Sequence, residues 1–105
     1  MEHKHLIYYA LNAQGENDIE FGTYPTENVE FISMPDEEFS YWYNGITDKL
    51  NQQFGLLIDE YESETVPYEI LEEFMKALDS EEQMPTLYSA IREAIRLKTN
   101  LELDL

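Results

Sequence analysis

Short stretches of apolar or alternating residues at both ends of the chain have the pattern of β-strands. Residues 6–11 are apolar and rich in tyrosine, residues 19–24 alternate, and turn formers fill 12–18 between them, so we expect a β-hairpin with a long loop. Residues 29–32 predict a third short strand, and the strict alternation at 101–105 allows one more. These strands are expected to form a small antiparallel sheet.

Apolar residues recur every three or four positions over about 35–54, the spacing that places side chains on one face of a helix. The residues of this stripe are Phe39, Trp42, Tyr43, Ile46, Leu50 and Phe54. Ser33 is expected to cap this first helix and Gly55 to end it. Gly45 lies inside it at a cost of about 1 kcal/mol relative to alanine, so we interpret this glycine as a point of close packing against the sheet.

The rest of the chain predicts two more helices. Residues 56–58 form a short apolar run that we expect to be buried, and a second helix is expected to start at 65–69. A third helix is predicted over 86–99, with its apolar residues facing inward. The expected fold class is therefore α+β, with a small antiparallel sheet packed against about three helices in one globular domain that spans 1–105.

Composition adds a strong charge imbalance to this picture. The chain carries 23 Asp and Glu against 6 Lys and Arg, a formal net charge of −17, yet 43% of its residues are hydrophobic and 13% are aromatic. Disordered chains with this much charge have too few apolar residues to form a core, so we expect a folded domain with a strongly negative surface. Because such a surface costs stability through self-repulsion, it favours a functional explanation, namely a basic protein partner.

The same charge disfavours other partners. Nucleic-acid binding requires clustered cations, and only Arg92, Arg96 and Lys98 lie close together. The chain has no cysteine, no apolar run near the ~18 residues that a membrane-spanning helix needs, and no signal-peptide pattern. We therefore expect a cytoplasmic protein that binds neither nucleic acid nor membranes directly, and the sequence leaves self-association open.

The stretch at 59–73 is the first candidate docking surface. It contains no basic residue, and Tyr61 and Tyr68 are interleaved with its carboxylates. The carboxylates are Asp59, Glu60, Glu62, Glu64, Glu69, Glu72 and Glu73. They would steer a cationic partner at long range, and the tyrosines would supply contact area after docking. The alternative is an acidic loop and helix face that only meet solvent.

A second candidate is the helix start at 36–43, where Glu37 and Glu38 precede three consecutive aromatic residues. Three successive helical residues span about 200°, so at least one of these aromatics should lie at the surface. Tyr41 is the outlier from the apolar stripe, and an exposed tyrosine beside two carboxylates is a candidate interface anchor. The alternative is that Tyr41 lies flat on the domain's own surface.

No motif indicates catalysis or a cofactor. The chain lacks a cysteine nucleophile, a nucleophile elbow, a phosphate-binding glycine loop and a zinc-protease helix. His3 and His5 alternate on a predicted strand without a third ligand nearby, and the acidic stretch does not have the spacing of a calcium loop. We expect neither enzymatic activity nor a physiological metal or cofactor.

Residues 57–69, with the sequence Leu-Ile-Asp-Glu-Tyr-Glu-Ser-Glu-Thr-Val-Pro-Tyr-Glu, lead into a predicted helix of this small, acidic, cysteine-free domain. Together with the aromatic-rich first helix, this segment resembles the small immunity proteins of bacterial polymorphic toxin systems. The resemblance implies that the protein binds one cognate toxin, often a basic nuclease, and blocks its active site or an adjacent exosite.

Two other functions compete with toxin immunity. A DNA mimic would inhibit a nucleic-acid-binding protein, and it would need carboxylates arrayed in rows like those of a duplex. A regulatory or structural subunit would use the acidity only to stay soluble, and it would have no tight basic partner.

Overall fold

The computed structural model describes residues 5–23, 27–78 and 80–105, which form four strands, five α-helices and one short 3-10 helix. In chain order these elements are β1 (His5–Ala10), α1 (Ala13–Phe21), β2 (Val29–Met34), α2 (Asp36–Gly45), α3 (Thr47–Phe54), β3 (Ser63–Val66), η1 (Tyr68–Ile70), α4 (Leu71–Ala77), α5 (Pro85–Leu97) and β4 (Leu101–Asp104). The predicted α+β class is confirmed, as are the third helix and the C-terminal strand.

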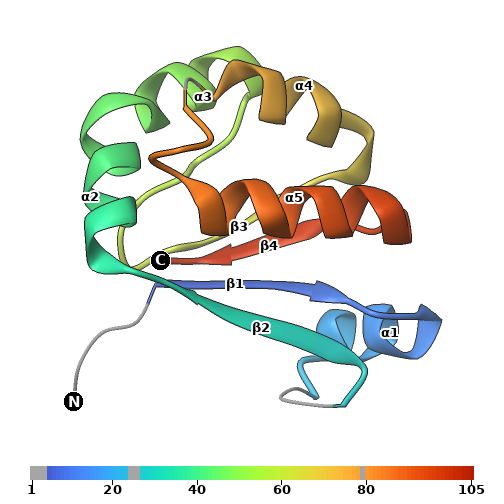
Figure 1. Cartoon of the computed structure of the whole chain (residues 1–105). Coiled ribbons are helices and arrows are strands. Elements are labelled where there is room, and N and C mark those ends of the chain that lie inside the picture. Colours follow the sequence, from blue (N-terminus) through green and yellow to red (C-terminus); the bar gives the residue numbers. More distant parts are fainter. Residues whose placement is uncertain (1–4, 24–26, 79) are drawn as a thin grey trace.

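The four strands form one antiparallel sheet in the order β2-β1-β4-β3 (Figure 1). The strands nearest the two chain ends, β1 and β4, therefore occupy its centre, and β2 and β3 form its edges. The register places Leu6 opposite both Ser33 of β2 and Asp104 of β4, and Asp104 opposite Ser63 of β3. One row of residues thus crosses the sheet from edge to edge.

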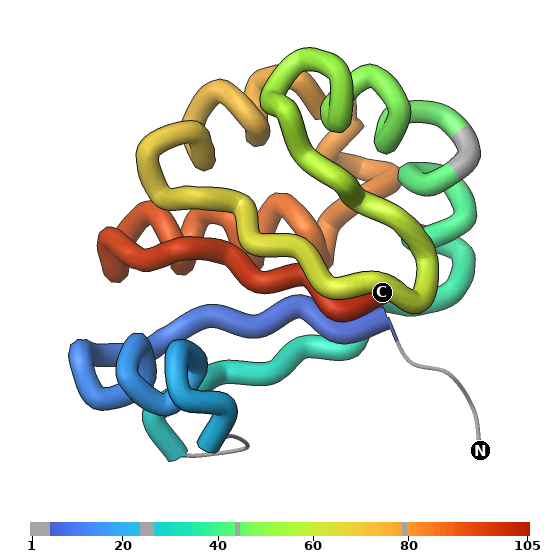
Figure 2. Tube along the Cα trace, turned by 180° about the vertical axis from the view of Figure 1, so that it is seen from behind, coloured from blue at the N-terminus to red at the C-terminus, as the bar shows by residue number. Residues whose placement is uncertain are grey.

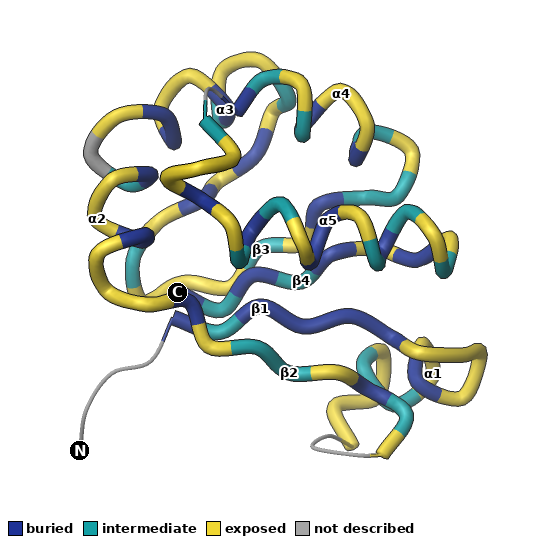
Figure 3. The backbone as a smooth tube through the Cα atoms, in the orientation of Figure 1, coloured by how far each residue is buried: buried dark blue, intermediate teal, exposed yellow. Residues whose placement is uncertain are grey.

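Helices α2 to α5 pack on one face of the sheet, and the core lies between the two layers. The fully buried side chains of this core include Trp42, Leu50, Phe74, Leu87 and Ile91 from the helices, and Ile7, Leu101 and Leu103 from the sheet. Each contributes about 1.5–3 kcal/mol by leaving water. Figure 3 shows β1 buried along most of its length, whereas the helices alternate between buried and exposed positions. Among the described residues, no helix is long and apolar enough to cross a membrane.

Helix α1 replaces the second strand of the predicted hairpin, so that prediction is wrong. The side chain of Asn12 accepts a hydrogen bond from the backbone N–H of Gly15 at 2.9 Å, and Gly22 ends the helix with φ 68°. These cap signals outweigh the alternation of a segment in which Phe21 is 73% exposed. A Cβ atom on Gly15 would lie 2.0 Å from the carbonyl oxygen of Asn28, so this glycine lets α1 lie directly against the sheet (Figure 2). Residue 24, the end of the predicted strand, lies outside the described residues.

The predicted first helix is divided at Ile46 into α2 and α3. Ser33 does not cap it but belongs to β2, and Pro35 occupies the N-cap position without a side-chain hydrogen bond. The interpretation of Gly45 is also wrong, because nothing lies within 4 Å of a Cβ atom built there. The prediction for Gly55 is confirmed, since it ends α3 in the left-handed conformation with φ 68°.

The strand β3 lies inside the acidic stretch, where the sequence predicted a helix start. Val66 is its one buried residue, so the strand has almost no apolar signature, and pairing with β4 stabilises it. Pro67 follows directly, and α4 begins only at Leu71. The run at 56–58 is not uniformly buried, because Leu57 is 79% exposed.

Candidate functional site

Three segments that are distant in sequence line one cavity at the end of the sheet where β1 starts. The loop between α3 and β3 passes the N-terminal half of α2, and the cavity between them has a volume of about 500 Å³. It is lined by His5 of β1, by Asp36, Phe39, Ser40 and Tyr43 of α2, and by Glu60 and Tyr61 of the loop. We call this cavity the acidic groove.

A stack of three rings forms one wall of the acidic groove. The ring of His5 lies parallel to that of Phe39 with centroids 3.7 Å apart, and Phe39 stacks on Tyr43 at 5.1 Å. The Nε2 atom of His5 is 3.4 Å from a carboxylate oxygen of Asp36, which is otherwise exposed to solvent. The groove therefore combines an aromatic surface with a carboxylate at its rim.

A hydrogen bond fixes the loop to α2. The hydroxyl of Tyr43 donates to the carboxylate of Asp59. Because ionisation of the phenol would remove this donor, the hydrogen bond to Asp59 raises the pKa of Tyr43. Asp59 also accepts the backbone N–H of Glu60 at 2.9 Å, so its carboxylate organises the turn as well as holding it in place.

The turn at 59–62 displays a tyrosine in a conformation that favours glycine. The N–H of Glu62 donates to the carbonyl oxygen of Asp59 at 3.3 Å, and Tyr61 at the tip has φ 67°. The left-handed conformation costs an L-residue about 1–2 kcal/mol. Tyr61 is nevertheless 70% exposed, so its side chain gains little burial in return within the chain.

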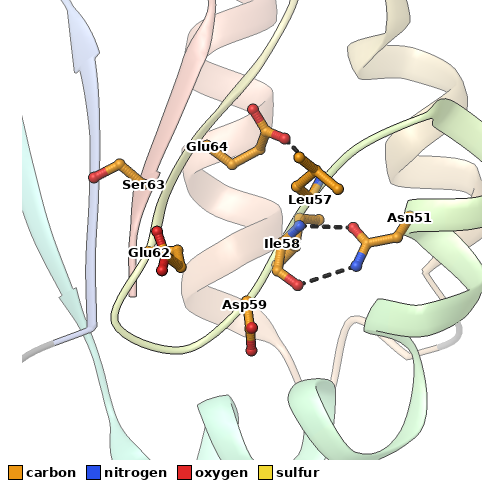
Figure 4. A pocket seen from close by; sticks show the side chains of 7 residues that line it. All are labelled: Asn51, Leu57, Ile58, Asp59, Glu62, Ser63 and Glu64. Carbon is orange, nitrogen blue, oxygen red and sulfur yellow. Dashed lines mark hydrogen bonds between the residues drawn. The ribbon is translucent and has the colours of Figure 1, made fainter.

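A second cavity, of about 380 Å³, is lined by residues of the same loop together with residues of α3 and β3 (Figure 4). The side-chain amide of Asn51 holds the backbone of Ile58 there, accepting its N–H at 2.8 Å and donating to its carbonyl oxygen at 3.0 Å. Leu57, next to this clamp, is the most exposed large apolar residue among those described. The loop thus offers a partner two exposed side chains, Leu57 and Tyr61, one on each side of Asp59.

Glu64 has a structural task in the same region. Its carboxylate accepts the N–H of Leu57 at 2.6 Å (Figure 4). It also accepts the N–H of the neighbouring residue Thr65 at 2.9 Å. It therefore ties the loop to β3 and covers part of the outer edge of that strand. Of the carboxylates predicted to face a partner, Glu64 is one that the fold already uses.

Glu38 must be removed from the predicted docking surface, because it is 6% exposed. Its two carboxylate oxygens accept the N–H groups of Thr86 at 3.1 Å and Leu87 at 2.8 Å, in the first turn of α5. A carboxylate at this place accepts hydrogen bonds from backbone donors that have no partner within their helix, and the positive end of the helix dipole stabilises its negative charge. Glu38 therefore joins α2 to α5.

The predicted docking residues fall into two groups rather than one surface. Asp59, Glu60, Tyr61 and Glu62 lie near the start of β3, close to α2, on which Glu37 and Tyr41 are exposed. Tyr68, Glu69, Glu72 and Glu73 lie beyond the other end of β3, in η1 and α4 (Figure 2). Strand β3 separates the two groups, which the helix predicted at 65–69 would have joined.

Three of the five described Lys and Arg residues form ion pairs, and these pairs lie in α4, in α5 and between α5 and the segment before it. Lys76 pairs with Glu73, Arg92 with Glu81, and Arg96 with Glu93. The pKa of Glu81 is lowered by its hydrogen bond from Arg92, and that of Glu93 by its hydrogen bond from Arg96. None of these cations pairs with Asp59, Glu60 or Glu62, so the negative charge near the acidic groove stays uncompensated by Lys or Arg in the described part of the chain.

Neither a metal centre nor a known relative defines this site. Within residues 5–23, 27–78 and 80–105, no group of three or more potential ligands could hold a metal ion, and His3 lies outside these ranges. Comparisons with protein-family models, curated proteins and solved structures give no significant match.

Sequence reasoning missed two residues of the site. Asp36 is not among the predicted docking residues, but the packing of α2 beside β1 places it at the rim of the acidic groove. Leu57 was assigned to a buried run, although Leu56 and Ile58 are buried and alternation would have placed the residue between them outward.

Proposed function

We propose that this protein is a non-enzymatic inhibitor that binds a basic protein through the acidic groove and the turn at 59–62. The observation that carries the proposal is the combination of two exposed anchors, Leu57 and Tyr61, with carboxylates that no described Lys or Arg neutralises. Partly apolar anchors surrounded by charge are typical of protein interfaces, since the charges speed encounter and the anchors hold the complex.

The partner's chemistry follows from the groove. A lysine or arginine entering it would meet Asp36 and Glu60 and lie against the ring of Tyr61, an arrangement that favours cations both by charge and by cation–π contact. The most specific form of the proposal is a bacterial immunity protein that neutralises a basic toxin domain. The resemblance of residues 57–69 to such proteins, together with the net charge of −17, supports this form.

Association kinetics with the captured partner test the proposal. The tagged protein is used to isolate its partner from the cell that encodes it, and the association rate is then measured over a range of salt concentrations. Replacing Glu60 and Glu62 with glutamine should slow association roughly threefold or more at low salt and flatten its salt dependence. Replacing Glu69 and Glu72 changes the net charge equally but at the other end of β3, and should have a smaller effect.

Two results would count against the proposal. Equal effects of the two double variants would mean that overall acidity, and not the carboxylates near the acidic groove, governs association. Absence of any tight basic partner would favour a regulatory or structural subunit. For the immunity form, a neighbouring upstream reading frame that ends in a basic toxin-like domain is the expected genetic context.

A further inference from the structure

The two edges of the sheet differ in how they are protected against another strand. Edge strands in natural proteins are normally short, interrupted, charged or covered, because their outer backbone groups can pair with a foreign chain. Strand β3 follows this rule, since it has four residues, the carboxylate of Glu64 accepts the N–H of Thr65, and Pro67 ends it. Pro35 likewise ends β2, but within the described residues no side chain accepts the N–H of Val29 or Ser33 as Glu64 accepts that of Thr65.

Strand β2 is longer and regular. Its six residues pair with β1 in unbroken register, without a bulge, and in the described part of the chain it pairs with no other strand. Within Val29–Met34 there is no proline and no lysine, and Glu30 is the one charged residue. Figure 1 shows β2 at the border of the sheet.

The pattern of hydrogen bonds between β1 and β2 shows which backbone groups of β2 point outward. The N–H of Leu11 donates to the carbonyl oxygen of Asn28 at 2.9 Å, so this pair and every second pair after it bond across the β1–β2 ladder. Val29 and Ser33 belong to the alternate pairs, whose N–H and C=O groups are directed away from β1. They present a backbone template to an extended chain.

The side chains beside this edge define the kind of chain it fits. On the helix side of the sheet an added strand would meet Glu30 and the partly buried Ile32, and on the opposite side it would meet the half-exposed ring of Phe31, which stacks on Tyr8 at 5.1 Å. Alternating basic and apolar residues match these two sides. No lysine or arginine occurs between Lys4 and Lys49. Helix α5, which packs against β2 on the helix side, brings Arg96 near Tyr9, but Arg96 is paired with Glu93.

We propose that β2 is a second interaction surface, at which an extended segment of a partner, with basic and apolar residues in alternation, adds a fifth strand to the sheet. The net charge of −17 on each copy opposes pairing of β2 with a second copy of this chain, and it attracts a segment of opposite charge. This surface is distinct from the acidic groove, and the inference holds whether or not the groove binds a partner.

A peptide that alternates lysine and valine over seven residues, blocked at both ends, is a direct probe. In an NMR hydrogen-exchange experiment at low salt, saturating peptide should slow exchange of the Ser33 amide by at least about tenfold and leave that of Thr65 unchanged. A matched peptide with N-methyl groups on alternate residues keeps the charge but cannot complete the ladder, and it should bind at least about tenfold more weakly. Equal binding of the two peptides would overturn the inference.

Paired variants locate the binding edge. Ser33→Pro removes one outward donor from β2, and Ser63→Pro removes the corresponding donor from β3 in the same row of the sheet. Proline is tolerated at such edge positions, and unfolding curves check that both variants fold. We expect peptide affinity to fall about threefold to tenfold for Ser33→Pro and to stay unchanged for Ser63→Pro. If Ser33→Pro does not fold, the comparison of the two peptides on the wild-type protein decides.

Two further outcomes would contradict the inference in distinguishable ways. Loss of peptide binding in the Glu60→Gln, Glu62→Gln variant, with binding retained in Ser33→Pro, would show that the peptide occupies the acidic groove, which supports the proposed function but not the second surface. A concentration-dependent dimer in sedimentation at the same low salt without peptide, abolished by Ser33→Pro, would show that a second copy occupies the edge instead.

Discussion

Removing the Glu38 carboxylate should destabilise the protein, because this carboxylate links α2 to α5. It has no part in the binding proposed for the acidic groove. In Glu38→Ala, the N–H groups of Thr86 and Leu87 lose a charged acceptor at a buried site. Hydrogen bonds to charged groups contribute about 1.5–3 kcal/mol, and the unmet backbone donors add part of their desolvation cost. Water entering the vacated space recovers some of this loss, so we expect a decrease of about 2–4 kcal/mol in the free energy of unfolding.

Urea unfolding followed by circular dichroism measures this decrease, with Glu37→Ala as the matched control. Glu37 is the neighbouring carboxylate in the first turn of α2, but it is exposed, so its loss should change stability by no more than about 0.5 kcal/mol. Glu38→Gln keeps one acceptor and should lie between the two. Equal losses for Glu37→Ala and Glu38→Ala, or a loss below about 1 kcal/mol for Glu38→Ala, would refute the role assigned to this carboxylate.

Four other substitutions test three separate features. Tyr61→Gly relieves a left-handed φ, so the protein should be as stable as the wild type or up to about 1 kcal/mol more stable. Its affinity for the basic partner should fall. A variant that binds as tightly as the wild type would show that Tyr61 is not part of the interface. Gly15→Ala should cost about 2 kcal/mol or more in urea unfolding, because its Cβ would meet the Asn28 carbonyl, whereas Gly45→Ala, in open space within a helix, should be neutral or gain up to about 1 kcal/mol. Burial raises the pKa of Glu102, so its ionisation opposes folding, and the stability that it contributes at low pH is lost as pH rises through the folded-state pKa. Glu102→Gln should therefore be more stable than the wild type at neutral pH, and unfolding curves should converge near about pH 3, where both side chains are uncharged; a constant difference across pH would contradict this explanation.

The two glycines show where sequence patterns succeed and fail. The cost of a glycine inside a helix predicts a packing contact at Gly45, yet this residue lies in open space where the helix divides. Gly15 looked like part of a loop, although Asn12 before it and Gly22 after it are ordinary helix cap residues. The cap residues at 12 and 22 therefore indicate the helix correctly. The alternation that predicted a strand there came from Ile19 and Phe21, which are not part of the core between the helices and the sheet.

Elements with a continuous apolar stripe were predicted well, and elements stabilised by neighbours were not. Helix α5 buries Leu87 and Ile91 together with two alanines at helical spacing, so periodicity alone identifies it. Strand β3 buries Val66 alone and depends on pairing with β4, which sequence pattern does not encode. The acidic groove was beyond prediction for the same reason, because β1, α2 and the 59–62 turn meet only after the sheet and its helix layer have formed.

Because β2 is an exposed edge strand, the net charge affects self-association of this protein as well as the encounter with a basic partner. A six-residue strand with little charge of its own would be a site of self-association in a neutral protein, since like edges pair readily. A charge of −17 on every copy opposes that encounter at low salt, and screening weakens the opposition because the Debye length shortens to about 3 Å at 1 M salt. High salt should therefore weaken binding of the basic partner while it promotes association between copies of this chain. Sedimentation of wild type and Ser33→Pro across salt concentrations separates the two effects: growth of oligomers with salt in the wild type alone would identify β2 as the edge that the charge protects.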